Sequence, residues 1–131
     1  MQGRLLPPIN GCIQEFPYDN WQVEFPFLKQ VELLGVEWLI TKNHFLNNPV
    51  MVNPHKLQDF PISSVCLDVL VDERIIEEEF LYNTLHVFCE RVKNTEINTI
   101  TIPLLEDSSL ENDIKRKAFC VLIAPIADKY P

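Results

Sequence analysis

The chain has 131 residues, of which 47% are hydrophobic and 23% are charged, proportions typical of one globular domain and not of a disordered segment. Its formal net charge of −8 disfavours general nucleic-acid binding, because a surface that binds phosphate backbones needs a basic field. No apolar stretch approaches the ~20 residues of a membrane span, and the first residues lack the apolar core of a signal peptide. We therefore expect a cytoplasmic protein with no membrane partner.

The four cysteines and three histidines form no familiar metal-binding or redox motif. No two cysteines have CxxC spacing, and each lies in or near an apolar segment, which favours reduced and mostly buried thiols. The histidines share no metal-site spacing, and we interpret His86 as an ordinary residue of a helix.

The amino-terminal third predicts a long loop, a helix and a strand. Residues 3–17 contain two glycines and three prolines, and loops this long within compact domains are usually functional. Asp19 or Asn20 is suited to cap a helix that runs to about Leu34, with Gly35 as the glycine just after its end. The apolar run 36–41 then predicts a buried strand.

The rest of the chain alternates between strands and helices. We predict a polar loop with a short helix at 54–60, a strand at 62–70, a helix at 73–93 capped by Asp72, and a strand at 97–105. A last helix spans about 110–129, and Pro125 within it predicts a kink or a break. Apolar strands separated by helices indicate a parallel α/β sheet, with the three strands neighbouring in chain order.

Several segments, in the same order, are similar to parts of a known barrel family: its opening, second strand, third strand, fourth strand with its loop, and fourth helix. These segments are residues 1–8 with 13–21, then 34–38, 64–68, 102–110 and 124–130. On them the chain resembles the sugar-phosphate isomerases/epimerases with a xylose-isomerase-like TIM barrel. The resemblance implies that residues 1–131 form a partial (β/α)₈ barrel, about the first four β/α units, with strand 1 truncated.

The resemblance also carries expectations about chemistry. Family members use a divalent metal, held by two Glu, an Asp and a His from strands 5 to 8, and no residue of this chain matches those positions. We therefore expect no metal site and no cofactor in this chain, which would be an inactive fragment by itself. The full-length family implies a sugar or sugar phosphate as the ligand.

Barrel enzymes place their chemistry at the carboxyl ends of the strands, where Gln2, Arg4, Asp68 and Glu106 are expected; Glu37 is expected within the second strand. Glu37 is the candidate catalytic residue; alternatively it forms a structural ion pair with Arg4 inside the barrel. Gln2 and Arg4 are candidate substrate ligands, and the planar guanidinium of Arg4 suits an oxyanion, unless it is an ordinary surface arginine. Asp68 and Glu106 could accept sugar hydroxyls; the alternatives are loop anchoring for Asp68 and helix capping for Glu106.

Two further possibilities concern cations and partners. The pairs Asp68/Asp72 and Glu106/Asp107 could bind a hard cation, although solvated loop carboxylates are the preferred interpretation. A half-barrel leaves two unpaired sheet edges, so we expect the chain to form a homo-oligomer or to pair with a complementing half-barrel. The alternative to an enzyme fragment is a half-barrel that oligomerises and binds a sugar or a protein partner without catalysis. We expect the exposed inner face to include apolar residues among Leu39, Val65, Leu67, Ile100 and Ile102. A related barrel acting on nucleic acid, like the apurinic endonucleases, is disfavoured by the negative charge.

Overall fold

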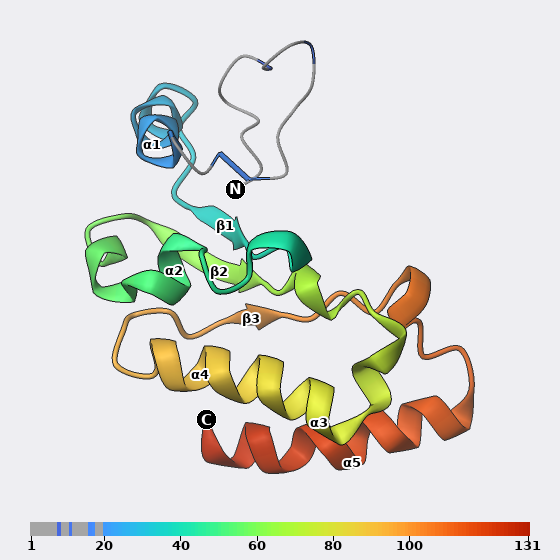
Figure 1. Cartoon of the computed structure of the whole chain (residues 1–131). Coiled ribbons are helices and arrows are strands. Elements are labelled where there is room, and N and C mark those ends of the chain that lie inside the picture. Colours follow the sequence, from blue (N-terminus) through green and yellow to red (C-terminus); the bar gives the residue numbers. More distant parts are fainter. Residues whose placement is uncertain (1–7, 9–10, 12–15, 18–19) are drawn as a thin grey trace.

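A computed structural model describes residues 8, 11, 16, 17 and 20–131. The predictions for Gln2 and Arg4, for the truncated first strand and for most of the amino-terminal loop fall outside these residues. Within them, the protein is an α/β structure built on one small parallel sheet (Figure 1).

The sheet contains three strands, β1 (Val36–Leu39), β2 (Ile62–Cys66) and β3 (Ile100–Thr101). They lie in the order β1-β2-β3 and both pairs are parallel, which confirms the predicted arrangement (Figure 1). Each strand is shorter than predicted. After β2 the chain bends into a 3₁₀ turn, Asp68–Leu70, in which the Val69 amide donates to the Ile40 carbonyl at 3.0 Å. After β3, Pro103 has no amide hydrogen to extend the ladder.

Five α-helical segments accompany the sheet, together with short 3₁₀ turns. The α-helices are α1 (Trp21–Gln30), α2 (Pro49–Val52), α3 (Glu78–Leu81), α4 (Val87–Val92) and α5 (Asp113–Lys129). A π-helical turn, η5 (Tyr82–His86), joins α3 to α4 without interruption. The 3₁₀ turns are η1 (Lys42–His44), η2 (Pro54–Leu57), η3 (Asp68–Leu70), η4 (Glu73–Ile76) and η6 (Glu106–Ser108).

The role predicted for Gly35 is wrong. Helix α1 already ends at Gln30, and Glu32, with a φ of 55°, adopts the left-handed conformation that follows it. Gly35 instead permits two chain segments to come close, because a Cβ there would lie 2.9 Å from the Pro61 carbonyl oxygen. The neighbouring Val36 amide donates to that same oxygen at 2.9 Å, at the start of the β1–β2 pairing.

The two long helices differ from the prediction at their beginnings. The helix expected over 73–93 starts at Glu78, because Glu77 has an extended backbone that separates it from η4. Asp72 does cap, but it caps η4, accepting from the Arg74 amide at 3.0 Å. Helix α5 starts at Asp113 and continues through Pro125, so the predicted break does not occur. One missing hydrogen bond on its exposed side is tolerated in a helix of 17 residues.

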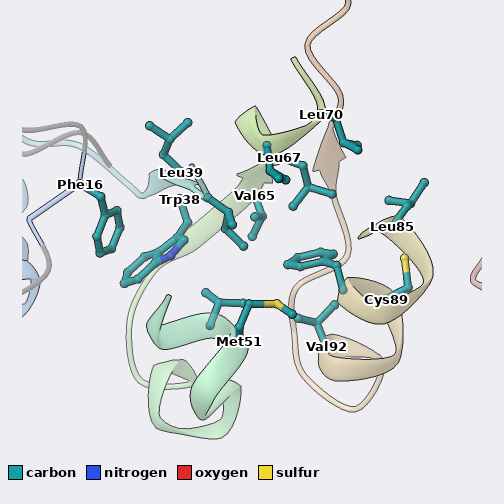
Figure 2. Packing of buried hydrophobic residues seen from close by; sticks show 14 of the residues in the cluster. Phe16, Trp38, Leu39, Met51, Val65, Leu67, Leu70, Leu85, Cys89 and Val92 are labelled. Carbon is teal, nitrogen blue, oxygen red and sulfur yellow. The ribbon is translucent and has the colours of Figure 1, made fainter. Parts of the chain in front are cut away.

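One face of the sheet packs on the helices and forms the core. Trp38, Val65 and Leu67 point towards Met51 of α2 and Val92 of α4 (Figure 2). The indole of Trp38 is fully buried and lies edge-on to Trp21 of α1, at 5.2 Å between ring centroids. Its Nε1 donates to Asn48 Oδ1 at 2.8 Å, and the Asn48 amide donates to the Leu39 carbonyl at 3.1 Å.

The expectation that the inner face exposes apolar residues is wrong for most of the named positions. Val65 and Leu67 are fully buried on the helix-covered face, and Ile100 pairs with Val65 there and is half-buried. Ile102 is also half-buried, and Leu39, although it points to the other side, is buried (Figure 2). Apart from Leu39, the face away from the helices presents Glu37, Ser64, Cys66 and Thr101, and it is therefore mainly polar.

Candidate functional site

The polar face of the sheet is formed by Glu37, Ser64, Cys66 and Thr101. The register pairs Glu37 with Ser64, and Cys66 with both Leu39 and Thr101. Paired residues of parallel strands project from the same side, so these side chains share one face. Glu37 and Thr101 are exposed, whereas Ser64 and Cys66 are half-buried. Glu37 therefore lies on the opposite face from Trp38, as alternation along a strand requires.

The carboxylate of Glu37 is held by hydroxyl groups from the two neighbouring strands. Its Oε1 accepts from Thr101 Oγ1 at 2.8 Å and from Ser64 Oγ at 3.2 Å. One oxygen thus joins all three strands, and because both hydroxyls donate to Oε1, Oε2 remains available for a ligand. The sequence prediction did not include Ser64 or Thr101, although period-two alternation from Glu37 and Cys66 would have pointed to them.

Cys66 lies beside Glu37 on this face and is a neutral thiol. Burial first, and then the negative charges of Glu37 and Asp68, raise the pKa of Cys66 to about 11. The reactive thiolate is therefore scarce at neutral pH, and Cys66 contributes a weak S–H donor and no nucleophile. Asp68, whose charge contributes to this shift, is half-buried in the turn η3 that directly follows β2.

Glu106 lies in the loop after β3 and is exposed. It begins η6 and has a φ of 52°, a left-handed conformation that is uncommon for a residue with a side chain. The buried Ser108 stabilises this turn, because its hydroxyl donates towards the carbonyls of Pro103 and Leu105, at 2.8 and 2.9 Å. The Leu105 amide donates back to the same hydroxyl at 3.1 Å. Glu106 is thus on the third loop at the carboxyl end of the sheet.

Lys42, Asp72 and Arg74 form an ion cluster at the carboxyl ends of β1 and β2. Asp72 is 5% exposed and accepts from Lys42 Nζ at 2.8 Å and from Arg74 Nε and Nη2 at 2.9 and 2.8 Å. The Arg74 guanidinium, followed by Lys42, holds the pKa of Asp72 well below its usual range. The guanidinium also lies 4.3 Å from the centroid of the Phe80 ring. This cluster ties together the loops that follow the first two strands.

The carboxylates of these loops do not assemble into a metal site within the part of the chain that the structure describes. Asp72 is already satisfied by two cations, so the pair Asp68/Asp72 is not available to a third. More generally, no group of three or more His, Cys, Asp or Glu side chains among the described residues could hold a metal ion.

Comparisons with known proteins add no relative. No family model matches the chain, and no curated protein and no solved structure matches it either. Across residues 20–131 no helix is long and apolar enough to cross a membrane. The structure thus defines an α/β protein with a three-stranded parallel sheet, one face of which is covered by helices and the other of which is polar.

Proposed function

We propose that the polar sheet face around Glu37 binds a sugar or sugar phosphate. In this proposal the face is part of the inner wall of a sugar-phosphate isomerase/epimerase-like (β/α)₈ barrel, to which this chain contributes the first β/α units. Parallel strands in chain order with the packed helices on the opposite face are compatible with such units. The observation that carries the proposal is the Glu37 carboxylate, fixed by Ser64 and Thr101 on the polar face.

The chemistry of this face suits a polyhydroxylated ligand. A sugar hydroxyl is a good donor to the free oxygen of Glu37, and a charge-assisted hydrogen bond of this kind contributes about 1.5–3 kcal/mol. Asp68, in the turn that directly follows β2, supplies a second carboxylate, whose negative charge acts on Cys66. In the proposed role, Glu37 accepts a proton from the carbon or hydroxyl next to the sugar carbonyl, and Ser64 and Thr101 keep the carboxylate in place.

The divalent metal of the family has no fitting set of ligands among the described residues. We therefore assign sugar binding to this chain and no metal-dependent step. The chain alone is expected to leave ketose and aldose phosphates unconverted, and EDTA-sensitive turnover by the purified chain would contradict this part of the proposal.

A titration monitored by ¹H–¹⁵N NMR tests the binding. Fructose 6-phosphate is expected to shift the backbone amides of β1 and β3 in a saturable way, and Glu37→Gln is expected to weaken binding about tenfold by removing the anionic acceptor. Glu79→Gln is the matched control, because Glu79 is an exposed residue of α3, away from the polar face. Shifts confined to other surfaces, or equal losses in the two variants, would refute the proposed site.

A non-catalytic half-barrel that associates with a second copy or with a complementing half-barrel is the second candidate. Ile114 and Val121 of α5 are 81% and 71% exposed, and two leucines after β3, Leu104 and Leu105, are also exposed. Apolar side chains at such exposure, together with the unpaired edge of β3 in the described sheet, favour association. Sedimentation velocity at about 100 µM tests this candidate, for which a dimer or larger species is expected; a sharply melting monomer would exclude it.

A further inference from the structure

A polar cavity of about 590 Å³ lies at the opposite end of the sheet from the carboxyl-end loops. Asn53 and His55 line it from the segment that leads into β2, and His86, Arg91 and Asn94 line it from η5, α4 and the segment that leads into β3. Segments that lead into parallel strands lie at their amino ends. The volume falls within the range of about 300–1,000 Å³ that is typical of small-molecule sites.

A chain of hydrogen bonds determines which nitrogen of His86 carries the proton. The Tyr130 hydroxyl lies 2.6 Å from His86 Nδ1 and also forms a short hydrogen bond with Glu90. Glu90 is ionised at neutral pH, because hydrogen bonds from Lys93 and Tyr130, and then from Lys129, lower its pKa to about 2. An ionised carboxylate can only accept, so Tyr130 gives its one proton to Glu90 and accepts from the Nδ1–H of His86. The lone pair of the neutral imidazole is therefore on Nε2.

The His86 ring is also fixed in orientation. The Tyr82 ring stacks on it with 4.4 Å between centroids and 24° between planes. Since Nδ1 is engaged by Tyr130 and the ring lines the cavity, the edge left for a ligand presents Nε2 as an acceptor. An oriented imidazole whose second nitrogen is hydrogen-bonded is the usual arrangement for a functional histidine.

Donors line the cavity from two segments, His55 from the segment that leads into β2 and Arg91 from α4, the continuation of the helix that carries His86. Gln58 Nε2 lies 3.3 Å from His55 Nδ1, and an amide nitrogen can only donate, so the proton of neutral His55 is on Nε2. Arg91 is exposed, and its side chain forms no hydrogen bond or ion pair with another described residue, which leaves the guanidinium available. The cavity thus combines a cationic donor, a neutral imidazole donor and an imidazole acceptor. The Glu90 carboxylate also lines it and is paired with Lys93, Lys129 and Tyr130.

We propose that this cavity is a binding site for inorganic phosphate. Arg91 and His55 donate to the ionised oxygens, and His86 Nε2 accepts from the oxygen that carries the proton. The guanidinium fork is suited to an oxyanion, and the acceptor lone pair selects an anion that still has an O–H group. Sulfate has the same size and charge but no O–H group at neutral pH, so it leaves that lone pair facing a negative oxygen.

NMR titration of the whole chain with phosphate and with sulfate, at constant ionic strength, tests the proposal. A pH of about 7.5 is used because an ordinary histidine is neutral there. Phosphate is expected to shift the ring signals of His55 and His86 in a saturable way and to bind at least about tenfold more tightly than sulfate. Absence of saturable shifts with phosphate, or equal affinity for the two anions, would overturn it.

Two variants separate the parts of the site. Arg91→Gln is expected to weaken phosphate binding about tenfold, whereas Lys117→Gln, which removes the same charge from an exposed position on α5, is expected to leave it unchanged. Equal losses in the two variants would mean that phosphate is attracted by charge alone, and they would overturn the proposal.

Tyr130→Phe tests the proton arrangement of His86. It is expected to bring the ratio of phosphate to sulfate affinity close to unity, because the His86 ring can then carry its proton on Nε2. A ratio unchanged in a variant with native circular dichroism would refute the assigned proton arrangement.

Discussion

Asn48 is the buried polar residue on which the packing of α2 against β1 depends most directly. Its Oδ1 accepts from Trp38 Nε1 at 2.8 Å and from the Val50 amide at 3.2 Å, and its Nδ2 donates to the Leu39 carbonyl at 3.1 Å. Replacing Asn48 with alanine removes all three bonds and leaves a buried indole N–H and a buried carbonyl without partners.

The size of the effect follows from these groups. Each buried group left without a partner costs about 1–3 kcal/mol, and loss of the helix cap adds about 1 kcal/mol. Water entering the space of the missing amide offsets part of this sum, so we expect Asn48→Ala to lower the free energy of unfolding by about 3–5 kcal/mol. This is a large part of the about 5–15 kcal/mol that stabilises a typical domain.

Urea unfolding, followed by far-UV circular dichroism and tryptophan fluorescence, measures this change. Asn47→Ala is the matched control, because its neighbouring side chain is exposed and its expected effect is within about 0.5 kcal/mol. A loss below about 1 kcal/mol in Asn48→Ala, or an equal loss in the two variants, would show that the buried hydrogen bonds do not have the role derived from the geometry.

Three further predictions test other parts of the fold. Asp72→Asn should lower stability by about 2 kcal/mol at neutral pH. Because the folded pKa of Asp72 is lowered, its contribution is present above the ordinary carboxyl pKa, and the difference from the unmodified protein should shrink as the pH falls below about 4 in unfolding experiments. Gly35→Ala should lower the melting temperature, with about 1–3 kcal/mol of destabilisation, because its Cβ would meet the Pro61 carbonyl; an unchanged melting temperature would contradict the close approach. A thiol reagent at mildly alkaline pH should label exposed Cys120 long before Cys66, as read by mass spectrometry, and the reverse order would contradict the burial of Cys66.

The strands of the sheet were predictable because local pattern and tertiary structure agree there. Apolar runs located each strand, and the alternation of side chains along a strand places Glu37 opposite Trp38. The ends of the strands were not predictable in this way. The chain leaves β2 early because the Val69 amide bonds to Ile40, a contact between segments that are distant in sequence. The close approach that Gly35 permits depends likewise on Pro61, which is distant in sequence. From sequence alone, a glycine just after a helical pattern is more commonly explained as the residue that ends the helix.

The candidate site was predictable only in part, for a similar reason. Period-two alternation is enough to locate Glu37, but its bonds to Ser64 and Thr101 require the register between strands. His86 was interpreted as an ordinary helix residue, and its partner Tyr130 lies 44 positions away. Only the packing of α5 beside the α3–η5–α4 helix brings these two together (Figure 1).

The contrast between the two faces of the sheet has a consequence for how the strands find their partners during folding. Side chains alternate between faces, so sliding a strand by one position exchanges all of its buried and exposed groups. A slipped β1 would turn the Glu37 carboxylate into the helix-covered layer and expose the Trp38 indole, and the same exchange in β2 would bury Ser64 in place of Val65. An unpaired carboxylate in an apolar layer is disfavoured by several kcal/mol. The polar face therefore disfavours misaligned pairings, because the helices cannot pack on a slipped sheet without burying this carboxylate.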